Sequence, residues 1–354
     1  MAHVVNLALQ GGGAHGAFTW GALDRILEDR SIESEGITAT SAGAMNAVAL
    51  KHGWVEDGRA GARDWLERFW LRVAGLDGII GEEMLDWLRH VWPSPALTSR
   101  LLELNHAVIA GDAVARVLSP YQFNPANFHP LRGIVEEMAD PSTASSATGP
   151  KLFISATNVR DGRPRIFQGD EITADAVLAS ACLPTLYQAV EIDDPRTGRR
   201  EAYWDGGYMG NPALYPLHYH TRAADILIVH INPLYREELP HTTGEIMSRL
   251  NEITFNASLL RELRNIEFVN RLLDDGTIPE ARMKRNFVHS VSDDALMNQL
   301  GLVTKMTISR TLLLQLRDAG RAAMDRFLAA HRDKLGRCSS IDLQSVVTSP
   351  GSRV

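Results

Sequence analysis

The sequence predicts an α/β fold with a mostly parallel central sheet covered by helices, followed by a helical C-terminal extension. Two early strand–helix units support this prediction: a strand over 4–9 before a helix over 14–29, and a strand over 37–40 before a helix over 42–50. Residues 225–231 form a continuous apolar run, typical of a strand buried within such a sheet. Successive strand–helix units favour parallel strands with helices on both faces.

The middle of the chain is expected to hold a helical segment and further strands. Residues 59–118 have helical character with tryptophans interspersed, and residues 140–150 have the composition of a loop. A helix is expected over 173–180, ending before Pro184. Short segments rich in β-forming residues predict four more strands, at 151–157, 165–167, 189–192 and 201–204.

The last third of the chain has longer and more amphipathic helical segments. Residues 242–273 and 307–335 predict two long helices, with one strand between them at 286–291. We therefore expect a core domain over residues 1–233 and a helical extension over 234–354 packed on that core. The amphipathic faces of the long helices are also compatible with a homo-oligomer.

Composition and charge exclude several classes of protein. The 354 residues include 45% hydrophobic and 22% charged side chains, which is typical of a globular protein. The net charge of −7 lacks the basic bias of a nucleic-acid binder, so no nucleic-acid partner is expected. The two cysteines, Cys182 and Cys338, form neither a disulfide framework nor a zinc-binding CxxC pair. Because no secretory signal or membrane-length apolar run is visible, we expect a cytoplasmic protein.

A glycine-rich stretch, Gln-Gly-Gly-Gly-Ala-His-Gly, follows the first predicted strand. Glycines between a strand and a helix let a ligand approach the backbone, where N–H groups can bind an anion. The stretch also fits the dinucleotide pattern GxGxxG through Gly11, Gly13 and Gly16, with Glu33 or Glu35 near the distance of a ribose ligand. An oxyanion site, a dinucleotide site and a turn without a ligand all fit this stretch alone.

Ser41 lies between a predicted strand and a predicted helix, in the stretch Thr-Ser-Ala-Gly-Ala. Small neighbours at such a turn are the layout of a nucleophile elbow, in which the serine backbone is strained and the hydroxyl is presented for attack. The N–H of Ala42 at the helix start could then stabilise negative charge. Serine is also a common helix N-cap, and on its own this stretch favours the cap.

Asp205 ends another predicted strand and is followed by Gly206 and Gly207. A carboxylate at this position can be held rigidly against a neighbouring strand end. Asp-Gly more often marks a simple turn, so this stretch does not decide the function by itself.

The combination and order of the three stretches are more specific. Gly-Gly-Gly-x-x-Gly, then Ser-x-Gly on an elbow, then Asp-Gly-Gly resembles the patatin-like phospholipase family of serine lipid acyl hydrolases. The resemblance covers residues 4–233, about two thirds of the chain. Ala179-Ser180 followed by Pro184 is similar to the stretch that precedes the aspartate in that family, and the residues after Pro233 are similar to the helical extension of some bacterial members.

The resemblance implies a three-layer α/β/α fold, with Ser41 as nucleophile and Asp205 as its base. It implies that three consecutive glycines supply oxyanion-hole amides: Gly11, Gly12 and Gly13. Small residues beside the catalytic groups would support them: Ala42, Gly43, Gly206 and Gly207. No metal and no cofactor are expected, because no His, Asp or Glu cluster has ligand spacing.

Two positions depart from the family pattern. Ala39 replaces the first glycine of the usual Gly-x-Ser-x-Gly, and we expect the elbow to survive because alanine keeps the strand end small. His15 stands where the family often has Arg or Lys, so we expect a positive charge there to depend on pH.

A Ser-Asp-His triad is the alternative to the dyad. Five histidines follow the aspartate in sequence: His218, His220, His230, His241 and His289. None of them lies in a distinctive motif, so we prefer the dyad of Ser41 and Asp205 on the strength of the Asp-Gly-Gly signal.

The predicted function is hydrolysis of acyl esters of lipids, with a lipid or ester substrate met transiently at a membrane or lipid-droplet surface. Trp87 and Trp92, in a leucine-rich segment broken by prolines, form either a lid or interfacial contact or, as we favour, a helical cap on the core. Two rival functions remain: a dinucleotide-binding oxidoreductase that uses the GxGxxG pattern, and a non-catalytic lipid-binding protein on the same fold.

Overall fold

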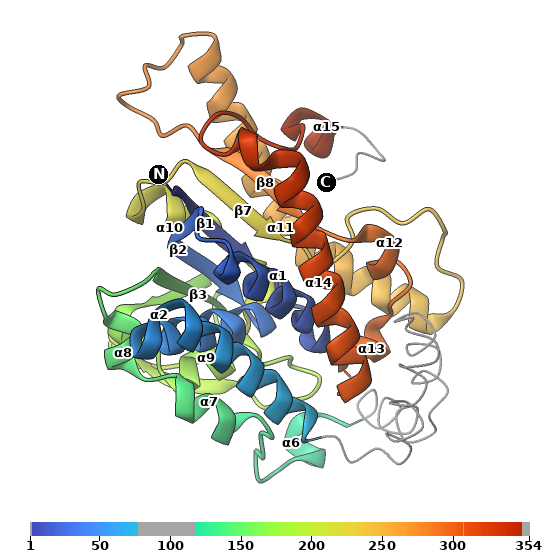
Figure 1. The fold of residues 1–354 in the computed structure, drawn as a ribbon. Coiled ribbons are helices and arrows are strands. Elements are labelled where there is room, and N and C mark those ends of the chain that lie inside the picture. Colours follow the sequence, from blue (N-terminus) through green and yellow to red (C-terminus); the bar gives the residue numbers. More distant parts are fainter. Residues whose placement is uncertain (1, 77–117, 307, 349–354) are drawn as a thin grey trace.

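A single mixed sheet runs through the computed structural model, which describes residues 2–76, 118–306 and 308–348 (Figure 1). Its strands are β1 (His3–Leu9), β2 (Ile32–Thr40), β3 (Lys151–Asn158), β4 (Pro164–Gln168), β5 (Val190–Asp194), β6 (Arg199–Asp205), β7 (Asp225–Val229) and β8 (Phe287–Val291). Their order is β5-β6-β3-β2-β1-β7-β8, and β4 also pairs with β3. Five neighbouring strands of this order are parallel: β3, β2, β1, β7 and β8. The pairs β3–β4, β3–β6 and β5–β6 are antiparallel.

Helices pack on both faces of this sheet and make a three-layer α/β/α arrangement (Figure 1). The described α-helices are α1 (Gly16–Glu28), α2 (Ala42–Ala74), α6 (Pro120–Phe123), α7 (Arg132–Met138), α8 (Pro141–Ser145), α9 (Ala174–Ser180), α10 (Tyr215–His220), α11 (Thr243–Asp274), α12 (Asp294–Met297), α13 (Leu302–Met306), α14 (Arg310–His331) and α15 (Leu343–Thr348). The predicted fold class, a mostly parallel sheet covered by helices, is confirmed.

Alternation along the strands divides the buried apolar side chains between two cores. Leu7 and Leu227 point into a core shared with α1, α2, α9 and α14. Ala8 and Ile228, their neighbours in the chain, point into a core shared with α10, α11 and α15. Both faces of the sheet are therefore buried, as its apolar central strands require.

The C-terminal part of the chain joins the same sheet and the same cores. β8 pairs in parallel with β7. α14 packs so closely along α1 that a Cβ on Gly21 would lie only 1.9 Å from the Arg317 carbonyl oxygen. The expected strand at 286–291 and the two long helices are present, as α11 and α14. Residues after 233 therefore extend the central sheet at its β8 edge.

Two elements differ in extent from their predictions. The helix predicted over 42–50 continues to Ala74, with a break at Asp57 and Gly58, whose backbone angles are not helical. The segment predicted as a loop over 140–150 contains α8, because the Asp140 side chain accepts a hydrogen bond from the Thr143 amide and caps a helix. The prediction for Trp87 and Trp92 falls in residues 77–117, outside the described part of the chain.

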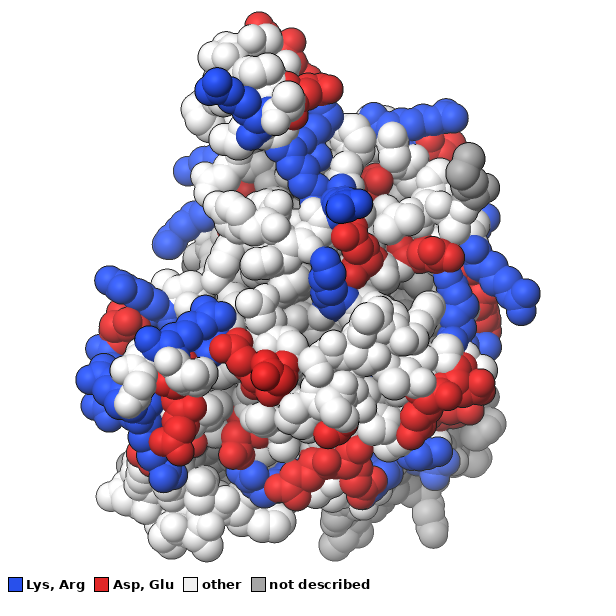
Figure 2. Space-filling model, turned by 90° about the vertical axis from the view of Figure 1, so that its left-hand side faces the viewer, with Lys and Arg blue, Asp and Glu red and all other residues white. Residues whose placement is uncertain are grey.

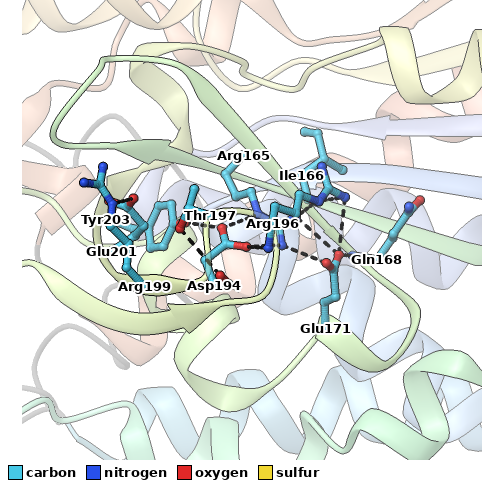
Figure 3. A network of polar contacts seen from close by, with 10 residues as sticks. All are labelled: Arg165, Ile166, Gln168, Glu171, Asp194, Arg196, Thr197, Arg199, Glu201 and Tyr203. Carbon is cyan, nitrogen blue, oxygen red and sulfur yellow. Dashed lines mark hydrogen bonds and ion pairs between the residues drawn. The ribbon is translucent and has the colours of Figure 1, made fainter.

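The edge strands carry a buried ionic network (Figure 3). Arg165 on β4 donates from Nε to Asp194 at the end of β5 (2.7 Å) and from Nη2 to Glu171 (2.7 Å). The Tyr203 hydroxyl on β6 donates to the same Asp194 carboxylate. Burial alone would raise the pKa of Asp194, but these hydrogen bonds outweigh it and lower the pKa to about 2. This network ties three strands together through an ionised carboxylate.

The outer surface on the side of this edge is mixed in charge. Figure 2 shows positive and negative side chains interspersed around uncharged surface, in keeping with the many surface ion pairs. Among the described residues, no helix has both the length and the hydropathy needed to span a membrane.

Candidate active site

The sheet register brings Ser41 and Asp205 to the two sides of one strand. Thr40, the last residue of β2, pairs with Ser155 on β3, and the next β3 residue, Ala156, pairs with Asp205 at the end of β6. Ser41, which follows β2, therefore emerges at the carboxyl end of the parallel strands, beside Asp205. Ligand sites of open α/β sheets commonly lie at this end.

Ser41 occupies a strained turn between β2 and α2. Its φ of 55° and ψ of −124° lie where a side chain is disfavoured, and such strain persists only where the surroundings enforce it. The Ser41 amide donates to the Ser180 hydroxyl (2.9 Å), which helps to hold the turn. The Ser41 side chain makes no capping hydrogen bond, so the geometry does not support the helix N-cap alternative. Ala39 is fully buried, and the elbow forms in its presence.

The start of α2 packs tightly against the end of β1. A Cβ on Gly43 would lie 2.4 Å from the Leu9 carbonyl oxygen and 2.8 Å from that of Gln10, so only glycine fits there. Ala42 and Gly43 thus let the amino end of α2 come close to the glycine-rich loop after β1. Positive potential at a helix amino end favours negative charge near Ser41.

Asp205 is fully buried and only partly hydrogen-bonded. Its Oδ1 accepts a hydrogen bond from the Gly207 amide (2.7 Å), and its own amide donates to the Cys182 carbonyl (2.8 Å). Its Oδ2 is buried without a well-formed hydrogen bond to a described residue. Burial raises the pKa of Asp205 to about 7, although the Gly207 amide and the Ser41 hydroxyl act to lower it.

The glycine-rich loop lies against Ser41. A Cβ on Gly11 would be 2.6 Å from the Ser41 Cβ. The Gly11 amide already donates to Oδ1 of Asn211 (2.6 Å), so it is occupied in this structure. The amides of Gly12 and Gly13 make no hydrogen bond to any described residue, which leaves these two of the three expected oxyanion donors available.

Buried side-chain amides hydrogen-bond this loop on its buried side, and the sequence did not predict them. Gln10 accepts the Ile231 amide (2.8 Å) through Oε1 and donates to Asn256 Oδ1 (3.1 Å) through Nε2. Asn232 donates from Nδ2 to the Gly11 carbonyl (2.8 Å). Asn211, just before Pro212, was the one member with a nearby signal, because it follows the Asp-Gly-Gly stretch by a few residues.

His15 is buried, and its surroundings disfavour the pH-dependent positive charge that the sequence predicts at this position. Burial lowers its pKa well below the usual value, and the positive charges of Lys305 and Arg236 lower it further. Its Nε2 lies 2.8 Å from the Thr304 hydroxyl of α13. The positive charge near the loop belongs to Lys305 instead, on a helix of the C-terminal part.

The downstream histidines do not form a hydrogen bond with Asp205. His289 pairs with Asp225 (2.8 Å), which starts β7 at the opposite end of the parallel strands from Ser41. His230 follows β7 at the site end, but burial lowers its pKa to about 4 and its Nε2 has no described partner. His218 and His220 lie on α10, and His241 is exposed before α11. The geometry therefore favours the dyad over the triad.

The dinucleotide alternative does not fit the arrangement around the glycines. A Cβ on Gly13 would lie 2.1 Å from the Lys305 carbonyl oxygen, so protein backbone fills the space that a pyrophosphate would need. Glu33 pairs with Val4 at the beginning of β1, far from the loop that follows its end. The Glu35 carboxylate is occupied by the backbone amides of Arg222 and Ala223.

Among the described residues, no group of three or more His, Cys, Asp or Glu side chains is placed to hold a metal ion. An open hollow of about 800 Å³ lies between α8, β3, β4 and β5, and its lining does not include Ser41 or Asp205.

Comparisons with known proteins identify the family of the chain. A family model described as patatin-like phospholipase matches residues 7–218, more than half of the chain. Among solved structures, the chain is similar to VipD from Legionella pneumophila, with 14% identity, a TM-score of 0.42, and coverage of 98% of this chain and 72% of that one. No curated protein matches the chain. On the family model, the chain belongs to the patatin-like phospholipase family of lipid acyl hydrolases.

Proposed function

We propose that this protein cleaves acyl esters of lipids in two steps, with Ser41 as nucleophile and Asp205 as its base. One observation carries the proposal: a serine in a strained turn, with its hydroxyl not used for capping, emerges beside a fully buried carboxylate, and burial raises the pKa of that carboxylate to about 7. A base with a pKa near the working pH is suited to accept and return a proton.

In the first step, Ser41 Oγ attacks the ester carbonyl while Asp205 accepts the hydroxyl proton. The tetrahedral oxyanion is stabilised by the Gly12 and Gly13 amides, and the amino end of α2 adds favourable potential. Collapse of the intermediate releases the alcohol, which takes the proton back from Asp205, and leaves an acyl-serine. Water then attacks this ester with Asp205 again as base, which releases the fatty acid and restores Ser41.

Burial of the carboxylate matters for this chemistry. An aspartate at its ordinary pKa of about 3.9 is a weak base toward a serine hydroxyl. Burial raises the pKa of Asp205 to about 7, which makes the carboxylate a stronger base toward the serine hydroxyl. The oxyanion donors lower the activation barrier further, by roughly 3 kcal/mol for one donor in other enzymes.

The test combines covalent labelling with ester hydrolysis. The wild type, Ser41→Ala and Asp205→Asn are treated with a fluorophosphonate probe and assayed on p-nitrophenyl esters of several chain lengths. We expect labelling to disappear in Ser41→Ala and ester turnover to fall at least about 1,000-fold in both variants. Ser155→Ala is the matched control, because Ser155 is also buried, on the adjacent strand, and its substitution should keep wild-type labelling.

The non-catalytic lipid-binding alternative predicts a different result. A wild type that is neither labelled nor active on any chain length, yet binds lipid vesicles, would establish that alternative and refute the hydrolase proposal. Labelling that persists in Ser41→Ala would mean that another nucleophile carries the reaction.

We also propose that the enzyme works in the cytoplasm and meets its substrate at a membrane or lipid-droplet surface through apolar contact. The net charge of −7 supports apolar contact over attraction to anionic lipid. Hydrolysis of the same phospholipid in zwitterionic and in anionic vesicles tests this point. We expect anionic lipid to give no increase in rate, and a large increase would contradict the proposal.

A further inference from the structure

A helix from the C-terminal part of the chain forms one wall of the glycine-rich loop. In Figure 1, α13 lies at the lower end of α14, close to where α1 begins. The carbonyl oxygen of Lys305 on α13 approaches Gly13 so closely that a Cβ there would lie 2.1 Å away. The neighbouring Thr304 hydroxyl lies 2.8 Å from His15 at the end of the loop. The loop beside Ser41 is therefore supported by a segment almost 300 residues later in sequence.

The side chain of Lys305 reaches the loop through one asparagine. Lys305 is 6% exposed, and its Nζ donates to Oδ1 of Asn232 (2.7 Å). Asn232 donates from Nδ2 to the carbonyl oxygen of Gly11 (2.8 Å). Burial lowers the pKa of Lys305 to about 8, which leaves the ammonium group mostly protonated at pH 7. The result is a chain of two hydrogen bonds from a buried cation to the loop backbone.

This chain acts on the peptide group that contains a proposed oxyanion donor. The Gly11 carbonyl and the Gly12 N–H belong to the same planar trans peptide, so they point in opposite directions. Because Asn232 holds the carbonyl toward the buried network, the Gly12 N–H points away from that network. A charge at one end of a hydrogen-bonded chain polarises its members, which strengthens the N–H as a donor.

We propose that Lys305 is a positioning residue of the oxyanion hole, which fixes and polarises the Gly11–Gly12 peptide through Asn232. The inference rests on the proposed function, since it assigns Lys305 a role in the hydrolysis by Ser41. It also gives the C-terminal part of the chain an indirect role in catalysis: the core over 1–233 contains the proposed nucleophile and base, but the cation that orients the oxyanion donor comes from α13.

A second buried lysine provides a matched control. Lys51 on α2 is 1% exposed, and burial lowers its pKa to about 8 as well. Its Nζ donates to the carbonyls of Ser146 (2.8 Å) and Thr148 (2.6 Å), which do not belong to the glycine loop or its amide network. A purely structural role of a buried lysine would thus be seen equally in both residues.

The test compares Lys305→Met with Lys51→Met in the full chain, below the unfolding temperature of both. Rates on p-nitrophenyl esters are normalised to the fraction of Ser41 that a fluorophosphonate probe titrates. We expect Lys305→Met to lower kcat by about 10- to 100-fold with KM within about twofold, because one oxyanion donor is weakened and not removed. Lys51→Met should keep kcat within about twofold, whatever its loss of stability. Equal kcat values in Lys305→Met and wild type would overturn the inference.

A double-mutant cycle tests the route through Asn232. Asn232→Leu removes both hydrogen bonds that connect Lys305 to the Gly11 carbonyl, so Lys305→Met should lower kcat by less than about twofold in that background. If the two substitutions lowered kcat independently, so that their effects multiplied, the route from Lys305 through Asn232 would be overturned. The failure of the two proposals is distinguishable: a wild type without turnover or labelling refutes the hydrolase function, whereas an active wild type with an equally active Lys305→Met refutes only the role of Lys305.

Discussion

Two buried aspartates end the neighbouring strands β5 and β6, and their surroundings give them opposite chemistry. Asp194 receives hydrogen bonds from Arg165 and Tyr203, which overcome burial and hold its pKa at about 2 (Figure 3). Among the described residues, Asp205 has no cation beside it and no well-formed hydrogen bond to its Oδ2, so burial raises its pKa to about 7. A buried carboxylate whose oxygens are all hydrogen-bonded stays ionised and stabilises the fold. A buried carboxylate with an oxygen that lacks a hydrogen bond has a raised pKa and can accept a proton near neutral pH.

The comparison predicts its largest effect for Asp205→Asn, which should lose activity and gain stability. We expect kcat to fall at least about 1,000-fold because the base is lost. Between about pH 4 and 7 the unfolded chain is ionised at this residue while the folded chain is protonated, so wild-type stability falls as pH rises. Asp205→Asn should lack that fall and be more stable at pH 8 by up to about 4 kcal/mol.

Urea denaturation at pH 5 and pH 8 measures this effect, with the difference between the two pH values compared in wild type and variant. If the free energy of unfolding changed equally with pH in wild type and variant, Asp205 would not be a buried group with a raised pKa.

Asp194→Asn should have the reverse outcome. The lowered pKa of Asp194 stabilises the fold above about pH 4, and this stabilisation is lost as pH falls toward 2. The substitution also removes one of the two carboxylates that pair with Arg165. We expect a loss of about 3 kcal/mol at pH 7 and kcat within about twofold of wild type. A large drop in kcat at full stability would mean that the network reaches the active site.

The pH dependence of kcat/KM should report the titration of Asp205 directly. Since the base must be ionised, kcat/KM should rise about tenfold per pH unit below 7 and level off above it. Cys182 and Tyr208 face Asp205, but burial raises the pKa of each to about 12, so both stay neutral through this range. A rise centred near pH 4 would show an aspartate with ordinary solvation and would remove the contrast with Asp194.

The sequence could indicate Ser41 and Asp205 as candidate site residues because their signal is local. Small residues after the serine and two glycines after the aspartate are visible without any knowledge of the fold. The opposite states of Asp194 and Asp205 were not predictable, since both are aspartates at strand ends and only their three-dimensional neighbours differ. The surroundings that lower the pKa of His15 were not predictable for the same reason, because they include Lys305 of α13, far along the chain.

The supporting residues were missed because they act across long sequence separations. Asn211 binds the Gly11 amide from 200 positions away, and Lys305 acts on the same loop through Asn232. Strand–helix periodicity was sufficient for the α/β class, because the β1–α1 and β2–α2 units form from neighbouring residues. The pairing of β8 with β7 depends on long-range contacts, so sequence periodicity indicates the strand but not its place in the sheet.

The smallest effect is expected for Cys182, which lies beside Asp205. Its carbonyl accepts the Asp205 amide, while its buried thiol donates to the Gln188 carbonyl (3.1 Å) and stays protonated. Because only the backbone of Cys182 contacts Asp205 by a hydrogen bond, Cys182→Ala should keep kcat within about twofold and destabilise the fold by about 1 kcal/mol. Cys338 is exposed, so Cys338→Ala is the control that should change neither quantity, and N-ethylmaleimide should react with Cys338 alone in the folded protein. Loss of activity in Cys182→Ala with the fold intact would show that the thiol contributes to the environment of Asp205, and the contrast between the two aspartates would then depend on more than hydrogen bonding to their carboxylates.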